Sequence, residues 1–239
     1  MQLGGEEYSL IGSTEWVEQH EKELTERAVI YLNADTIVSG KYVLVTSGSP
    51  LVKDTILDFS KTVMDPNAHD DKETIFDIML ERNPSKKDPS KPNVGNLGSG
   101  SDYASFYQFI GVPSADFYYI FGYNNTQIFY PVYHSQHDTF NWTTKFVDPD
   151  FTLHKAVTQL TGGLVVQFAD MPLLPMSVTL YAEALTGSLN SLKSSYKEKL
   201  KSHAKSLGFL EDAVKLFQET AKNFTTARYA HDILYSHPR

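Results

Sequence analysis

Short apolar runs of strand length alternate with helical patterns from the N-terminus to about residue 171. The runs "AVIYLN", "KYVLVTS" and "SADFYYIF" are rich in β-branched and aromatic residues, which favours buried strands. Between and around them, "SPLVKDTILDFSKTVM" and "FTLHKAVTQLTGGLVVQFAD" place apolar side chains at helical spacing. The alternation predicts an α/β fold, with a sheet flanked by helices.

The pattern changes after "MPLLP", where the strand-like runs stop. Two helical segments follow, each with one apolar stripe, and Gly208 is expected at the turn between them. The spacing predicts a helical hairpin, the unit of a helix bundle. We therefore expect a sheet-containing part over residues 1–171 and a helical part over residues 172–239. The two stripes are Leu185, Leu189, Leu192, Tyr196 and Leu200, then Leu210, Val214, Phe217, Ala221 and Phe224.

Two local patterns complete the predicted organisation. Ser13 or Thr14 is a suitable N-cap for a helix that runs to about Arg27. Residues 83–100 are rich in Pro, Gly, Ser and Lys and predict a long loop, followed by a short helix in "DYASFYQFIG".

Composition excludes several classes of function. The net charge of −8 argues against nucleic acid and anionic membranes as partners. The chain has no cysteine, which excludes disulfides, cysteine-based zinc sites and thiol catalysis. No apolar run is long enough to cross a bilayer, and no signal peptide is visible after Met1.

Although no signal peptide is visible, three sequons indicate an exported protein. They are Asn-X-Thr triplets, the acceptor pattern for N-glycosylation. Such triplets also arise by chance, so each one alone is weak support. The acceptor residues are Asn124, Asn141 and Asn223.

Three polar stretches are candidates for chemistry. The adjacent Glu6 and Glu7 precede the first helix, Asp35 follows the strand "VIYLN", and Tyr133 and His134 follow an aromatic run. Carboxylate and imidazole are the ligands of hydrolytic zinc sites, and a further carboxylate can take the proton of the bound water. The alternatives are a solvated surface pair, a turn or cap aspartate, and a surface loop.

Four ordered motifs carry a resemblance to a known family. The stretches "EEYSLIGSTEW", "YLNAD", "LGSGSDYASFYQFIGVPSADF" and "YPVYHSQHDTF" resemble consecutive motifs of the glutamate carboxypeptidase II family, the transferrin-receptor-like zinc exopeptidases. The similarity extends over nearly the whole chain. It implies the C-terminal part of a zinc peptidase domain, followed by part of a helical dimerisation domain.

The resemblance assigns roles to individual residues. Glu6 matches the general base, Tyr133 the phenol that supports the oxyanion, Glu7 and His134 ligands of one zinc, and Asp35 a ligand of the other. The other matches are Ser99, Gly100 and Ser101 in the substrate-lining loop, and Glu15 and Glu18 in a structural calcium site. Two Zn²⁺ ions, one Ca²⁺ ion, a peptide substrate and a homodimer are thus expected for a complete relative, in the secretory pathway or on a membrane facing outward.

Parts of the family pattern have no counterpart in this chain. A His and a bridging carboxylate are expected upstream of the Glu pair, but only five residues precede Glu6. The dimerisation domain of the family is also longer. We therefore expect a fragment that lacks two metal ligands and has little activity alone.

One substitution bears on specificity. Glutamate carboxypeptidase II has two arginines in the segment that corresponds to "SADFYYI", where this chain has Asp116 and Tyr118. The resemblance implies an exopeptidase of the carboxypeptidase or dipeptidase type. A carboxylate favours a cation, so Asp116 could instead pair with the α-ammonium of a substrate, as in an aminopeptidase, and the sequence leaves both activities open. The alternative for Asp116 is a solvent-exposed carboxylate. The alternative for the protein is a non-catalytic, receptor-like binding or dimerisation protein.

Overall fold

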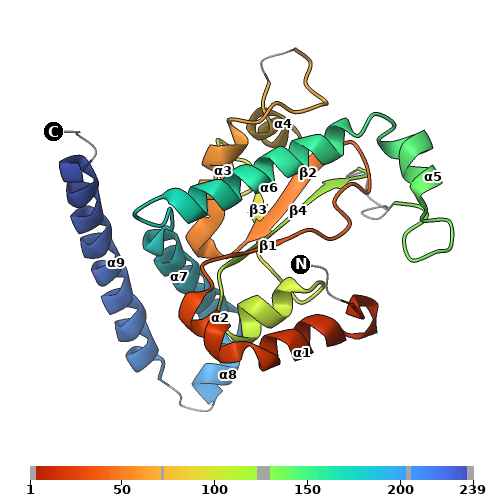
Figure 1. Ribbon diagram of the computed structural model, residues 1–239. Coiled ribbons are helices and arrows are strands. Elements are labelled where there is room, and N and C mark those ends of the chain that lie inside the picture. Colours follow the sequence, from red (N-terminus) through yellow and green to blue (C-terminus); the bar gives the residue numbers. More distant parts are fainter. Residues whose placement is uncertain (1–3, 71–72, 123–129, 203–205, 236–239) are drawn as a thin grey trace. The chain divides into compact units, whose positions relative to one another are not determined.

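The chain forms two compact units, residues 1–175 and 176–239. A computed structural model describes residues 4–70, 73–122, 130–202 and 206–235, with side chains as far as residue 228. The first unit is a mixed α/β structure and the second consists of helices (Figure 1). The predicted fold class is therefore confirmed.

The first unit is built on a four-stranded mixed sheet. Its strands are β1 (Tyr31–Asn33), β2 (Val43–Gly48), β3 (Val94–Gly95) and β4 (Ser114–Ile120), in the order β1-β4-β2-β3. β4 pairs parallel to β1 and antiparallel to β2, and β2 pairs parallel to β3. β1 and β4 lie within two of the predicted strand runs, and β2 overlaps the third and extends one residue beyond it, to Gly48. β3 was not predicted because it is two residues long and lies inside the proline-rich loop segment.

Helices cover the sheet. Figure 1 shows α6 running across strands β2 and β4, and α6 contacts both β4 and α3. The helices of this unit are α1 (Ile11–Gln19), α2 (Glu21–Arg27), α3 (Lys53–Ser60), α4 (Ile75–Arg82), α5 (Phe140–Trp142) and α6 (Thr152–Asp170). Four shorter helical segments are η1 (Glu6–Tyr8) and η2 (Pro50–Val52), both 3₁₀, and η3 (Ser105–Phe109) and η4 (Thr143–Val147), both π.

The core lies between the sheet and these helices. Phe117 and Tyr119 of β4 are fully buried, as expected for a central strand. Leu44 of β2, Ile56 of α3 and Leu160 of α6 are buried as well. A second cluster joins α1 to η3 through Val17 and Phe106. This cluster positions the N-terminal segment against the end of the sheet.

The first helix differs from its prediction. It begins at Ile11, with Leu10 in the left-handed region (φ 59°) at the N-cap, and it is divided from α2 at His20. Neither predicted N-cap residue serves as one, because Ser13 lies inside the helix and its hydroxyl donates back to the Leu10 carbonyl (3.1 Å).

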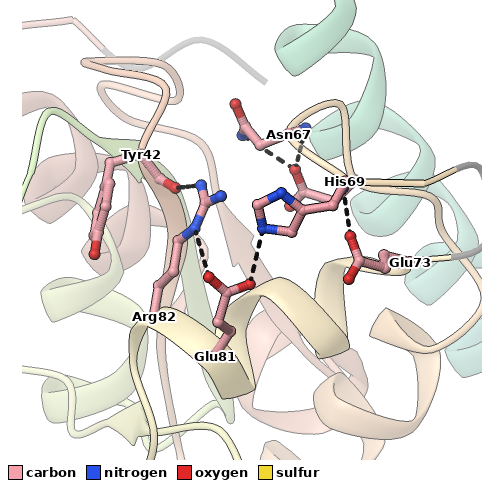
Figure 2. Close-up of polar contacts among 7 residues, drawn as sticks. Tyr42, Asn67, His69, Glu73, Glu81 and Arg82 are labelled. Atoms are coloured by element: carbon pink, nitrogen blue, oxygen red, sulfur yellow. Dashed lines mark hydrogen bonds and ion pairs between the residues drawn. The ribbon is translucent and has the colours of Figure 1, made fainter.

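Helix α4 was not predicted, although its start carries a strong signal. Thr74 and Asp77 form a capping box, and Ile75, Ile78 and Met79 bury one face. His69, in the segment before this helix, is tied to the helix by a polar contact (Figure 2). Glu81 contacts both the His69 ring (3.3 Å) and the Arg82 guanidinium (3.8 Å).

The second unit consists of α7 (Val178–Ser195), α8 (Lys197–Ser202) and α9 (Gly208–Tyr235). α7 and α9 pack together through the buried Ala182, Val214 and Ala221. Gly208 begins α9 itself. The predicted pair of helices is present, with the short α8 between them.

Two further observations concern the membrane and the sequons. Within the described residues, no helix combines the length and the apolarity that crossing a bilayer requires. Asn141 and Asn223 are exposed on α5 and α9, whereas Asn124 lies outside the described residues.

Candidate active site

The Glu6–Glu7 pair lies in a tight turn that is folded back onto the start of α1. Gly5 (φ 70°) and Ser9 (φ 68°) take left-handed conformations at the two ends of η1. A Cβ atom on Gly12 would lie 1.8 Å from the Gly4 carbonyl oxygen. Glycine at position 12 therefore allows the turn to pack against the helix, and it presents the two carboxylates beside each other.

His134 meets this turn from a distant part of the chain. Its Nε2 atom lies 3.1 Å from Glu7 Oε2, and the Tyr133 ring stacks on its imidazole with centroids 3.9 Å apart. The backbone at His134 is left-handed (φ 54°), in a loop closed by the bond that the Tyr130 hydroxyl donates to Asp138. The Glu7–His134 separation is that of an ion pair, and it is also close to the roughly 3.3 Å between two ligand atoms of one tetrahedral zinc ion.

Asp35 approaches the same region from the end of β1. Its Oδ2 atom accepts a hydrogen bond from Ser101 Oγ (2.9 Å), and its Oδ1 atom accepts one from Thr36 Oγ1 (3.1 Å). The Asn33 amide donates to Ser101 Oγ (3.0 Å) and to Asp116 Oδ1 (2.9 Å). Asp35 thus carries two hydrogen bonds while remaining exposed.

The electrostatics show that the three stretches share one region. Burial raises the pKa of Glu6, and the neighbouring charges of Asp35, Glu7 and Asp102 raise it further, while His134 lowers it. Burial likewise raises the pKa of Tyr133, with added contributions from Glu7, Asp35 and Glu6. Carboxylates gathered in this way destabilise one another's charged forms, and a divalent cation would relieve that repulsion.

The donors present fit zinc in chemistry but do not form a complete set. Among the described residues, no three His, Cys, Asp or Glu side chains are grouped so that they could hold one metal ion. Glu7 and His134 are in direct contact. The zinc roles of Glu7, His134 and Asp35 remain predictions.

The remaining predicted site residues take different positions. Ser99 and Gly100 are exposed, and the Gly100 amide donates to the Tyr103 hydroxyl (3.3 Å). Ser101 is buried and contacts Asp35 rather than solvent. Glu15 and Glu18 are both exposed on α1, and their calcium role remains a prediction.

The structure differs from the sequence-based expectations at two aspartates, Asp116 and Asp102. Asp116 is only 9% exposed, so its interpretation as a solvent-exposed carboxylate is wrong. Asp102 was not predicted at all, yet it contributes to the raised pKa of Glu6. Its buried Oδ1 atom has no hydrogen-bond partner among the described residues. Its position directly after Ser101 was the one signal that could have identified it.

The comparisons with known proteins cover this whole region. The model of "Peptidase family M28" matches residues 1–148, which include every candidate residue from Glu6 to His134. The chain is 36% identical over 222 residues to "Aminopeptidase NAALADL1" of Rattus norvegicus, covering 91% of this chain and 29% of that protein. It is 35% identical over 184 residues to "Glutamate carboxypeptidase 2 homolog" of Caenorhabditis elegans, covering 75% of this chain and 23% of that protein.

The chain spans less than a third of the length of these curated relatives. The match to the family model nevertheless covers more than half of the chain, and it contains the Glu pair, the aspartate that follows β1 and the histidine that contacts Glu7. The chain belongs to peptidase family M28, a family of zinc metallopeptidases.

Proposed function

We propose that the protein containing this chain is a zinc-dependent exopeptidase that hydrolyses terminal peptide bonds. The observation that carries the proposal is the contact of Glu7 with His134 beside Glu6, whose pKa is raised by its surroundings. In this proposal, Glu7 and His134 hold one zinc ion and Asp35 holds a second. When bound, the two ions supply a water of lowered pKa and a polarised scissile carbonyl.

The side chains of this chain then have distinct tasks. Glu6, which is not assigned to a metal, accepts a proton from the attacking water and delivers it to the leaving amine. The Tyr133 hydroxyl donates a hydrogen bond to the oxygen that becomes negatively charged.

The test is the substitution Glu6→Gln in the purified full-length protein that contains this chain, because the chain alone is expected to have little activity. We expect peptidase activity to fall by about 10²- to 10⁴-fold, because general base catalysis is lost. Zinc content should remain at the wild-type level, since Glu6 is not a ligand. Glu26→Gln, a change at an exposed position on α2, is the control. Wild-type activity in Glu6→Gln would refute the role of Glu6, and absence of hydrolysis by the wild type would favour the receptor-like alternative.

For the substrate end, we propose aminopeptidase activity, with Asp116 pairing with the α-ammonium of the substrate. Only Asn33 and Ser101 separate the Asp116 carboxylate from Asp35 in the hydrogen-bond network, so a group bound there lies near the proposed centre. An aminopeptidase among the relatives supports the same choice. Hydrolysis of a free-amine dipeptide should exceed that of its N-acetylated form, and the reverse preference would refute the proposal.

Three further properties are proposed on family grounds. The helical unit, residues 176–239, is proposed to be part of a homodimerisation domain. Glu15 and Glu18 are proposed ligands of a structural Ca²⁺ ion, and the protein is proposed to be exported. The exposed positions of Asn141 and Asn223 are compatible with glycosylation. Equilibrium sedimentation, calcium titration and glycosidase treatment of the purified protein test these points separately.

A further inference from the structure

Resting on the proposed metal role of Asp35, we propose that Asn33 and Ser101 are positioning residues that fix the orientation of the Asp35 carboxylate. They form a chain of hydrogen bonds from Asp116 to Asn33, from Asn33 to Ser101, and from Ser101 to Asp35. The three bonds are 2.9, 3.0 and 2.9 Å long. This assigns Ser101 to the support of a metal ligand rather than to contact with the substrate.

The sheet determines where this chain of bonds begins. β1 and β4 run parallel, and their register places Asn33 directly opposite Asp116. Asn33 is 3% exposed and Ser101 is 4% exposed, so both are shielded from competing water. Asp35 follows Asn33 by two residues and is exposed, so a buried and ordered pair of side chains supports a ligand at the surface.

The direction of each hydrogen bond follows from the chemistry of the groups. The Asn33 amide presents its NH₂ group to Asp116 Oδ1, and this bond favours the ionised carboxylate although burial raises the pKa of Asp116. The same NH₂ group donates its second hydrogen to Ser101 Oγ, which therefore acts as an acceptor there. The single hydroxyl hydrogen of Ser101 is then left for Asp35. The buried Asp116 thus sets the polarity of the whole chain of bonds.

The result is a carboxylate held at both oxygens. Ser101 donates to Oδ2 and Thr36 donates to Oδ1, which fixes the rotation of the Asp35 carboxylate about its last torsion. Each oxygen keeps a further lone pair for a cation. Hydrogen bonds of this kind to a metal ligand typically change metal affinity by about 10- to 100-fold.

The first test is zinc affinity of the purified protein with Ser101→Ala, measured by competition with a chelator. We expect affinity for Zn²⁺ to fall by about 10- to 100-fold. Ser60→Ala is the matched control, because Ser60 is also buried and also donates one hydrogen bond, to the Leu57 carbonyl (2.7 Å), outside the site. With Co²⁺ in place of zinc, the visible absorption bands should shift in Ser101→Ala and not in Ser60→Ala.

The second test removes the Asn33 donor without adding charge. Asn33→Leu has a similar volume but no NH₂ group, so no donor holds Ser101 Oγ as an acceptor and its hydroxyl hydrogen is no longer directed to Asp35. The proposal predicts weaker zinc binding in Asn33→Leu than in the wild type. Melting curves without metal establish that each variant is folded.

The outcomes distinguish this inference from the proposed function. If the wild type binds zinc and hydrolyses peptides but Ser101→Ala binds zinc as tightly, the positioning role is wrong and the proposed function stands. Wild-type zinc affinity in Asn33→Leu would overturn the inference in the same way, and this outcome can be measured even if Ser101→Ala does not fold. A wild-type protein that binds no zinc would overturn both.

Discussion

At the scale of single residues, Asp148 shows how one buried carboxylate organises a helix start. It is 2% exposed and accepts hydrogen bonds from the backbone amides of Leu153 (3.3 Å) and His154 (3.0 Å) and from the His154 ring (2.7 Å). The N-cap residue of α6, Phe151, is left-handed (φ 55°) and makes no side-chain cap bond with any described residue. Asp148 lies outside the helix but accepts the hydrogen bonds of two amides in its first turn, as an N-cap side chain normally does.

The pKa of Asp148 makes this role testable through pH. Burial alone would raise the pKa, but the hydrogen bonds from His154 and Leu153 bring it below the ordinary value of 3.8. A depressed folded-state pKa contributes stability above pH 3.8, and that stability is lost as pH falls through the folded-state pKa.

We predict that Asp148→Ala lowers the free energy of unfolding by about 2–3 kcal/mol at neutral pH, because charged hydrogen bonds and a cap are lost. The difference from the wild type should shrink below the folded-state pKa of Asp148. Urea unfolding at several pH values measures both effects, with the exposed Asp150→Ala as control. A difference that does not change with pH would contradict the prediction.

At the scale of elements, the glycine pair in α6 serves the packing of two helices. A Cβ atom on Gly163 would lie 1.9 Å from Cζ of Phe59 in α3, so the absence of a side chain lets the Phe59 ring lie against α6. Gly162 is exposed, and a Cβ atom there would meet no described atom within 4 Å. Only one of the two adjacent glycines is therefore required by the fold.

We predict opposite effects for the two alanine substitutions. Gly163→Ala should destabilise the first unit by about 1–3 kcal/mol, because the ring must move out of a packed position. Gly162→Ala should stabilise it by up to about 1 kcal/mol, because alanine favours the helix and meets no obstacle. Thermal unfolding of the pair provides its own matched control, and equal shifts of the two midpoints would refute the packing argument.

At the scale of the whole molecule, the two compact units each have their own core. In the second unit, Ala182 and Ala221 are buried where α7 meets α9, and Gln218 donates to Thr186 between the same helices (2.6 Å). Small residues at this contact let the two helices approach closely. A larger side chain there should disturb this unit and leave the sheet unchanged.

We predict that Ala221→Leu lowers the protection of α7 and α9 amides in hydrogen exchange, with a cost of about 1–3 kcal/mol. Protection of the β4 amides should remain at the wild-type level. Ala213→Leu, an exposed position on the same helix, is the matched control. Equal loss of protection in β4 would show that the two units unfold together.

The sequence determined those helices and strands that can be recognised from the apolar pattern within one segment. The runs that became β1, β2 and β4, the helical period of α6 and the stripes of α7 and α9 are all readable because their apolar residues repeat at fixed spacing. The family also followed from the sequence, since its motifs occur in order. These features need no knowledge of which segments meet.

Only the tertiary structure decided which residues contact one another. The contact of Glu7 with His134, the parallel register that sets Asn33 against Asp116 and the left-handed start of α1 at Leu10 all depend on segments far apart in sequence or on local packing. A hydrogen bond has a direction and a reach of about 3 Å, so it forms only where the fold brings donor and acceptor together. The spacing of apolar residues does not show which donor meets which acceptor. The hydrogen bond from Ser101 to Asp35 could therefore be found only in the structure.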